Sequence, residues 1–134
     1  MSYPDGYYRY FDLFNREEFW EAHEALEELW RDLKDGVPVR AGAVKAAPGD
    51  EYFLRGLIVF AAAFVHVQRN NPSGCRQVLE KCVRWLDPFA PTYWGVDVDG
   101  VLQHARYCLA QLNQVPPGGD LGQYLPFMRL KPNQ

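Results

Sequence analysis

The stretch that decides the fold of this chain is residues 19–30, FWEAHEALEELW. On a helical wheel with 100° per residue, its apolar side chains fall in one stripe, while most of its carboxylates face the other way. Continued one turn further, the stripe consists of Phe19, Ala22, Leu26, Leu29 and Leu33. This pattern predicts an amphipathic helix over about residues 16–34, packed by one face against a helical core. Gly36 and Pro38 are expected to end it.

Three later segments also show helical patterns. They are expected at about residues 51–69, 73–86 and 98–112. The first of them is apolar almost all round, which is typical of a helix in the middle of a bundle. Asp50 and Asp97 each precede one of these segments and are expected to cap it. Asn15 together with Glu18 is expected to cap the helix at 16–34 in the same way.

The remaining segments differ in composition from the helices. Residues 1–15 are rich in Tyr and Phe and are expected to pack as a short turn or helix. Residues 35–50 predict a long, mobile loop, and residues 124–131 an extended tail that covers an apolar groove. No convincing strand pair is present. The sequence therefore predicts a single all-α domain over residues 1–134. It is a compact bundle of four main helices, with the aromatic N-terminal segment and the extended C-terminal tail packed on it.

Composition and charge exclude several classes of protein. A chain of 134 residues suits one domain, and its net charge of −3 at pH 7 argues against a nucleic-acid binder. Eight acidic and three basic residues fall within residues 16–35, so the first predicted helix presents an acidic surface. The longest apolar run, residues 57–65, is too short to span a membrane, and no signal peptide is evident. Three cysteines without a CxxC pair favour a reduced, cytoplasmic protein in which they are core residues.

The histidine inside the opening motif is the main chemical clue. His23 lies at the edge of the apolar stripe and is four residues from Glu27, so the two are neighbours on the helix flank. If the helices at 16–34 and 51–69 form an antiparallel hairpin, residue numbers at one level sum to roughly 85. That register places Trp30 beside Arg55 and predicts an ion pair from Arg55 to Glu27 or Glu24. His66 then lies about one turn from His23.

The motif FNREEFWEAHEALEELW, followed about twenty residues later by RGLIVFAAAFVH and then by NPSG, resembles the domain-of-unknown-function family numbered 309. The resemblance covers about residues 11–86. It implies a small, prokaryotic, all-helical protein and no established activity. The positions that carry it are Asn15, Phe19, His23, Glu24, Leu26, Glu27, Trp30, Arg55, Gly56, Ala61, Ala62 and His66.

Two functional hypotheses follow from the polar cluster between the first two helices. In the first, the chain is a cytoplasmic binding or interaction module for a small molecule or protein. In the second, His23, Glu27 and His66 serve a metal-dependent or acid/base enzyme, since two histidines and a carboxylate can ligate zinc or iron. HxxxE is not the HExxH signature, so the cofactor stays unknown. The candidate residues are His23, Glu24, Glu27, Trp30, Arg55 and His66.

Two other interpretations stay open. The aromatic N-terminal segment and the tail are compatible with self-association into a homo-oligomer. Alternatively, the aromatics belong to the core, and His23 and Glu27 satisfy each other without any further role. The sequence contains no nucleophile with an evident base, no phosphate-binding glycine loop and no nucleotide fingerprint.

Overall fold

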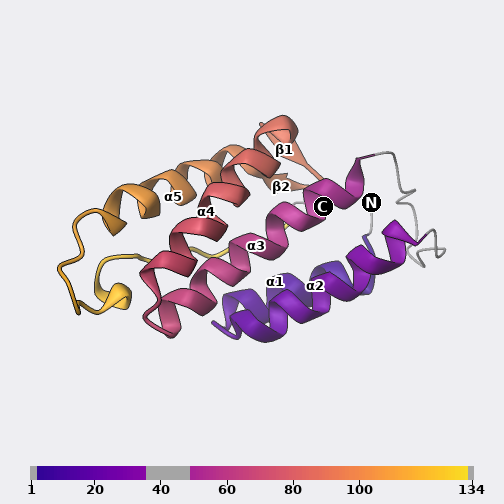
Figure 1. The fold of residues 1–134 in the computed structure, drawn as a ribbon. Helices are drawn as coiled ribbons and strands as arrows, with labels where there is room; N and C mark the ends of the chain where they lie inside the picture. The colour runs from indigo at the N-terminus through magenta and orange to yellow at the C-terminus, as the bar shows by residue number, and fades with distance from the viewer. Residues whose placement is uncertain (1–2, 36–48, 133–134) are drawn as a thin grey trace.

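The computed structural model describes residues 3–35 and 49–132 of the chain. Within these residues the chain forms five α-helices, two 3₁₀ turns and one short hairpin (Figure 1). The α-helices are α1 Asp5–Asn15, α2 Phe19–Lys34, α3 Asp50–Gln68, α4 Pro72–Leu86 and α5 Val98–Leu112. The short elements are η1 Asp87–Phe89, β1 Thr92–Tyr93, β2 Val96–Asp97 and η2 Leu121–Gln123. The prediction of an all-α bundle is confirmed.

The helix α3 occupies the middle of the bundle because it is apolar almost all round. Figure 1 shows it running between α1 and α2 on one side and α4 and α5 on the other. Eleven of its residues are buried, compared with four in α2. Gly56 allows α4 to approach closely, since a Cβ at this position would lie 2.4 Å from Leu86 Cδ2. The absence of a side chain at Gly56 therefore sets the spacing between α3 and α4.

The aromatic N-terminal segment forms a helix of its own, α1. Tyr7, Tyr10 and Phe14 are fully buried along its inner face. Phe14 stacks on Phe60 of α3 with ring centroids 5.6 Å apart, and the Tyr10 hydroxyl donates to the Leu57 carbonyl at 2.6 Å. Each buried aromatic ring removes on the order of 150–250 Å² from water. The helix α1 is therefore part of the core.

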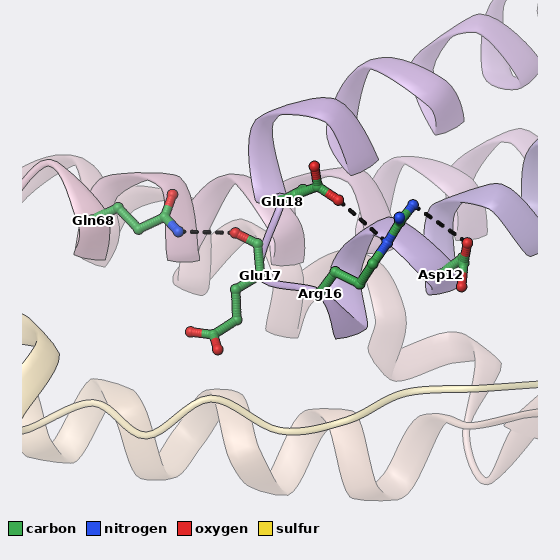
Figure 2. A network of polar contacts seen from close by, with 5 residues as sticks. All are labelled: Asp12, Arg16, Glu17, Glu18 and Gln68. Carbon is green, nitrogen blue, oxygen red and sulfur yellow. Dashed lines mark hydrogen bonds and ion pairs between the residues drawn. The ribbon is translucent and has the colours of Figure 1, made fainter.

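A polar network holds the corner between α1 and α2 (Figure 2). Glu17 turns the chain with a left-handed backbone, φ 60°. Gln68, at the end of α3, donates to the Glu17 carbonyl at 3.0 Å, and Arg16 pairs with both Asp12 and Glu18. The Gln68 bond ties the start of α2 to the end of α3. It thereby helps to set the antiparallel register of these two helices.

The short hairpin of β1 and β2 packs near the first turn of α3. The sequence did not predict it, because each strand has only two residues. Asp50 does not cap α3: the N-cap is Gly49, and Asp50 is 2% exposed and accepts a hydrogen bond from the Tyr93 hydroxyl. That capping prediction was wrong because the carboxylate has a tertiary partner. Asp97 does cap α5, with a 3.0 Å bond from a backbone N–H.

The C-terminal tail is extended and lies on the helices, as predicted. Asn15 holds its end, since its Nδ2 donates to the Leu130 carbonyl at 2.6 Å and its Oδ1 accepts from the Leu130 N–H at 2.8 Å. Asn70 accepts from the Leu121 N–H at 2.8 Å, where the tail begins. Asn15 is therefore a clamp for the tail. It is not the predicted cap of α2, whose N-cap is Glu18 without a side-chain bond.

A histidine and several rings complete the surface beneath the tail. His104 Nε2 lies 2.7 Å from the Pro126 carbonyl and donates to it. Phe127 of the tail contacts Phe19, with ring centroids 5.6 Å apart. Burial lowers the pKa of His104, and the bond to Pro126 opposes this shift only in part. We call the residues that hold the tail the tail groove: Phe14, Asn15, Phe19, Asn70 and His104.

Two further predictions concern a membrane span and the loop at residues 35–50. Among the described residues, no helix is both long and apolar enough to cross a membrane. The loop predicted at residues 35–50 lies outside the described residues except at its two ends.

Candidate functional site

Along its flank nearest α3, the helix α2 presents a series of side chains spaced three and four residues apart. They are Trp20, His23, Glu27, Trp30 and Lys34, here called the α2 stripe. Residues at this spacing are neighbours on a helix surface. The Trp20 ring stacks on the His23 ring with centroids 5.2 Å apart, and Lys34 Nζ lies 5.2 Å from the Trp30 ring centroid. The helical spacing alone brings these side chains together.

His23 and Glu27 form the predicted pair in the middle of the stripe. His23 Nε2 lies 3.2 Å from one Glu27 oxygen, and Arg31 Nη1 lies 3.2 Å from the other. Glu24 comes only within 3.8 Å of His23 Nδ1 and is 54% exposed. Both oxygens of Glu27 are therefore occupied by partners on its own helix. An exposed helical ion pair such as Arg31–Glu27 contributes about 0.3–0.5 kcal/mol.

Arg55 does not make the predicted ion pair with Glu27 or Glu24. Its guanidinium carbon lies 4.3 Å from the Trp85 ring centroid and 5.6 Å from that of Trp30. The prediction was wrong because Glu27 is already paired within α2, and because a planar, weakly hydrated guanidinium stacks well on indole rings. The predicted register is confirmed, since Trp30 and Arg55 do lie side by side.

A second cation–aromatic pair lies at the other end of the two helices. Arg69 of α3 sits over the Trp20 ring, 5.5 Å from its centroid, and Trp20 is 47% exposed. The pairs Trp30–Arg55 and Trp20–Arg69 thus join α2 to α3 at two levels. The spacing along α2 places His23 and Glu27 between them. We call the α2 stripe together with Arg55, Arg69 and Trp85 the α2–α3 seam.

His66 has partners other than the predicted ones. Its Nδ1 lies 3.2 Å from Asn71 Nδ2, and its ring packs so close to Gly74 that a Cβ there would come within 2.6 Å. Burial, followed by the charge of a neighbouring arginine, lowers the pKa of His66. No three or more His, Cys, Asp or Glu side chains of the described residues are grouped to hold a metal ion. His66 therefore does not complete a three-ligand set with His23 and Glu27. A proton-transfer role for the pair alone stays a prediction.

Two buried polar atoms in the described part of the chain have no hydrogen-bond partner, and both belong to the α2 stripe. They are His23 Nδ1 and Trp30 Nε1. Native proteins pair more than about 90% of their buried polar groups, and an unpaired one costs about 1–3 kcal/mol. The sequence contained no signal for these atoms, because the helices packed around them decide whether a partner is present.

A groove of about 640 Å³ opens between the start of α1 and the outer side of α2. Its charged lining consists of Asp5, Arg9, Glu21, Glu24, Glu28 and Asp32. The sequence predicted the acidic surface of α2 but not that α1 would supply a second wall. Of the predicted site residues, only Glu24 lines this groove, because the others lie on different sides of the helices.

The three cysteines are buried among the helices. All are free and buried, and burial raises the pKa of the Cys75 and Cys108 thiols to about 12. A thiol with such a pKa stays protonated near neutral pH and reacts poorly. The prediction that they are core residues agrees with their burial.

Comparison with known families identifies the chain's relatives. The sequence matches the family described as "Domain of unknown function (DUF309)" over residues 7–78, which is more than half of the chain. This range includes the whole α2 stripe and Arg55, whereas Trp85 and His104 lie beyond it. No protein with a curated description matches the sequence. The chain therefore belongs to the DUF309 family, whose members have no assigned function.

Proposed function

We propose that this protein is a helical binding module that recognises a partner protein through the α2–α3 seam. The seam combines three tryptophans with two arginines and a His–Glu pair. Tryptophan and arginine are the residue types that most often dominate binding energy at protein interfaces. A role in binding requires no nucleophile or metal.

The observation that carries this proposal is the pair of unpartnered buried atoms, His23 Nδ1 and Trp30 Nε1. Both lie on one stripe of one helix, seven residues apart. A partner that brings hydrogen-bonding groups to this stripe, with a small adjustment of the side chains over these atoms, would remove a cost of about 1–3 kcal/mol for each.

The dimensions of the seam favour a protein over a small molecule. The stripe runs from Trp20 to Lys34, which is about 20 Å at a rise of 1.5 Å per residue. That length suits a helix or an extended segment laid along α2 and α3, which is a common mode of recognition. A small ligand is more often enclosed in a pocket that buries most of its surface.

A cytoplasmic location is part of the proposal. It is supported by the three free cysteines, because a reducing compartment keeps such thiols from forming disulfides. Self-association is one form that partner binding can take, with a second copy as the partner.

The test is affinity capture of proteins from a cell lysate with three baits. The baits are the wild-type chain, the seam variant Trp20→Ala/Arg55→Ala and the matched control Arg106→Ala/Tyr107→Ala. The control removes one arginine and one half-exposed aromatic from α5, away from the seam. The amount of each protein retained by the wild type and the control is expected to be at least about tenfold lower on the seam variant. A tenfold loss of affinity corresponds to about 1.4 kcal/mol of binding free energy. Circular dichroism checks that all three baits are folded.

The proposal fails if all three folded baits retain the same proteins in the same amounts. It also fails if the control variant loses them as strongly as the seam variant does.

A further inference from the structure

Arg55 is a cation whose guanidinium makes no hydrogen bond with the residues that the structure describes. A guanidinium carries five N–H donors in a fixed plane and has no acceptor. Arg55 makes no ion pair or hydrogen bond within residues 3–35 and 49–132, and its contacts there are with the faces of Trp30 and Trp85. Glu27, the nearest predicted partner, is taken by His23 and Arg31. The donors at the edge of the guanidinium therefore remain available.

The two indoles restrict the orientation of these donors. Rings from α2 and α4 contact the same guanidinium, at 5.6 Å and 4.3 Å from its carbon. Aromatic faces stabilise a cation that lies over them, so the position of the group is restricted before any ligand arrives. A donor group that is already ordered loses less rotamer entropy on binding. Contacts with aromatic rings also offer the guanidinium N–H groups no oxygen or nitrogen acceptor.

Two other groups near Arg55, the Lys34 ammonium and the Trp30 indole N–H, would also be stabilised by a negatively charged ligand. Lys34 Nζ lies 5.2 Å from the Trp30 ring and has no carboxylate partner among the described residues. Trp30 Nε1–H is a buried donor without an acceptor. Two cations therefore lie near the Trp30 ring, whose own N–H has no acceptor. No acid among the described residues is paired with either cation or with this N–H.

We propose that Arg55, held by Trp30 and Trp85, is a binding site for a carboxylate group. A carboxylate is planar and matches the edge of a guanidinium with two parallel N–H···O bonds. Lys34 adds a second positive charge near the Trp30 ring. The inference rests on the proposed function, because a partner protein supplies such a group as an Asp or Glu side chain or as its C-terminus. A free carboxylate metabolite has the same chemistry, and the experiment separates the two sources.

The experiment is an NMR titration of the full chain labelled with ¹⁵N. One probe is sodium acetate, and the other is a blocked pentapeptide with one central glutamate between alanines. Sodium chloride at equal ionic strength serves as the reference. Arg55 Nε–H and Trp30 Nε1–H are expected to shift saturably with either carboxylate and not with chloride. Tighter binding of the peptide indicates a polypeptide source, and equal binding by acetate indicates a small molecule.

Two variants identify the group responsible. Arg55→Gln is expected to abolish the saturable shift of Trp30 Nε1–H. Arg55→Lys keeps the charge but loses the planar fork, so it is expected to bind at least about fivefold more weakly. Arg106→Gln is the control, because Arg106 lies on α5 outside the seam, and it should leave the shift unchanged. Dispersed spectra of all variants confirm folding.

The inference is overturned if neither carboxylate produces a shift beyond that of chloride, or if the shift survives Arg55→Gln. These outcomes differ from failure of the proposed function. Carboxylate binding without any captured protein removes only the protein partner. If affinity capture depends on the seam but the NMR shift does not depend on Arg55, only the carboxylate site is rejected.

Discussion

The tail groove and the α2–α3 seam differ in how their polar groups are used. In the tail groove, Asn15, Asn70 and His104 all bond to the backbone of the tail. In the α2–α3 seam, Arg55 makes no hydrogen bond within the described part of the chain, and His23 Nδ1 and Trp30 Nε1 have no partner there. A surface whose polar groups are satisfied within the chain contributes to folding. A surface that leaves them unsatisfied suits the recognition of something outside the chain.

The strongest test of this comparison removes one aromatic ring from each side. Phe14→Ala empties a fully buried position that contacts the rings of Phe60 and Phe64. We expect it to lower the free energy of unfolding by about 3–5 kcal/mol, because the transfer and cavity terms add. Trp20→Ala, at a half-exposed position of the seam, should cost about 1 kcal/mol or less. Urea denaturation measures both, and equal losses would contradict the comparison.

The next test concerns the clamp on the tail. Asn15→Ala leaves the N–H and carbonyl of the buried Leu130 without partners and should destabilise the fold by about 2 kcal/mol. Hydrogen exchange at the Leu130 amide should accelerate. The exposed neighbour Asp12→Ala is the control and should change stability by no more than about 0.5 kcal/mol. An unchanged Leu130 amide would show that the clamp does not hold the tail.

The pH dependence of stability tests His104 beneath the tail. Its folded pKa is lowered from 6.5 mainly by burial, so the unfolded state binds the proton more readily. The stabilisation is therefore complete above pH 6.5 and is lost as the pH falls through the lowered folded pKa. His104→Gln keeps a donor for the Pro126 carbonyl and should flatten this loss between pH 7.5 and 5. His66 also has a lowered pKa and therefore contributes to the pH dependence of stability. The variant His66→Gln measures that contribution separately. A slope unchanged in His104→Gln would reject the role of His104.

The smallest expected effect is the stability loss on removing Arg55. Arg55→Gln should cost about 0.5–1 kcal/mol, the range for cation–aromatic contacts near a surface. Arg69→Gln should cost a similar amount, and thermal unfolding of the two variants should nearly coincide. If Arg55→Gln instead destabilised the chain as much as Phe14→Ala, the seam would be part of the folding core.

Periodicity predicted the bundle because helical spacing is a local property of the sequence. The helix at 98–112, the end of α2 at residue 34, the central position of α3 and the extended tail agree with the structure, whereas α2 begins at Phe19 and not near residue 16. The register that puts Trp30 beside Arg55 was also predictable, since two antiparallel helices joined in sequence have few ways to pack. The resemblance to the DUF309 family is confirmed over residues 7–78.

Partner choice among polar side chains was not predictable from local spacing. Asn15 and Asp50 both precede or adjoin a helix and look like caps, yet each bonds to a segment far along the chain. Arg55 was expected to pair with a carboxylate, but the ring of Trp85 on α4 offers a closer contact. Each of these outcomes depends on a third element that the reasoning about two neighbouring helices did not include.

The sequence by itself determined which faces are apolar, where α2 begins its amphipathic pattern and that His23 and Glu27 meet. These properties follow from the rise and turn of one helix. Only the tertiary structure decided that His66 bonds to Asn71 and that the tail satisfies Asn15. It also decided that Arg55 contacts two indoles and forms no hydrogen bond among the described residues. The physical reason is that hydrogen bonds and stacking act over a few ångströms. Which groups come that close is settled by the packing of helices distant in the sequence.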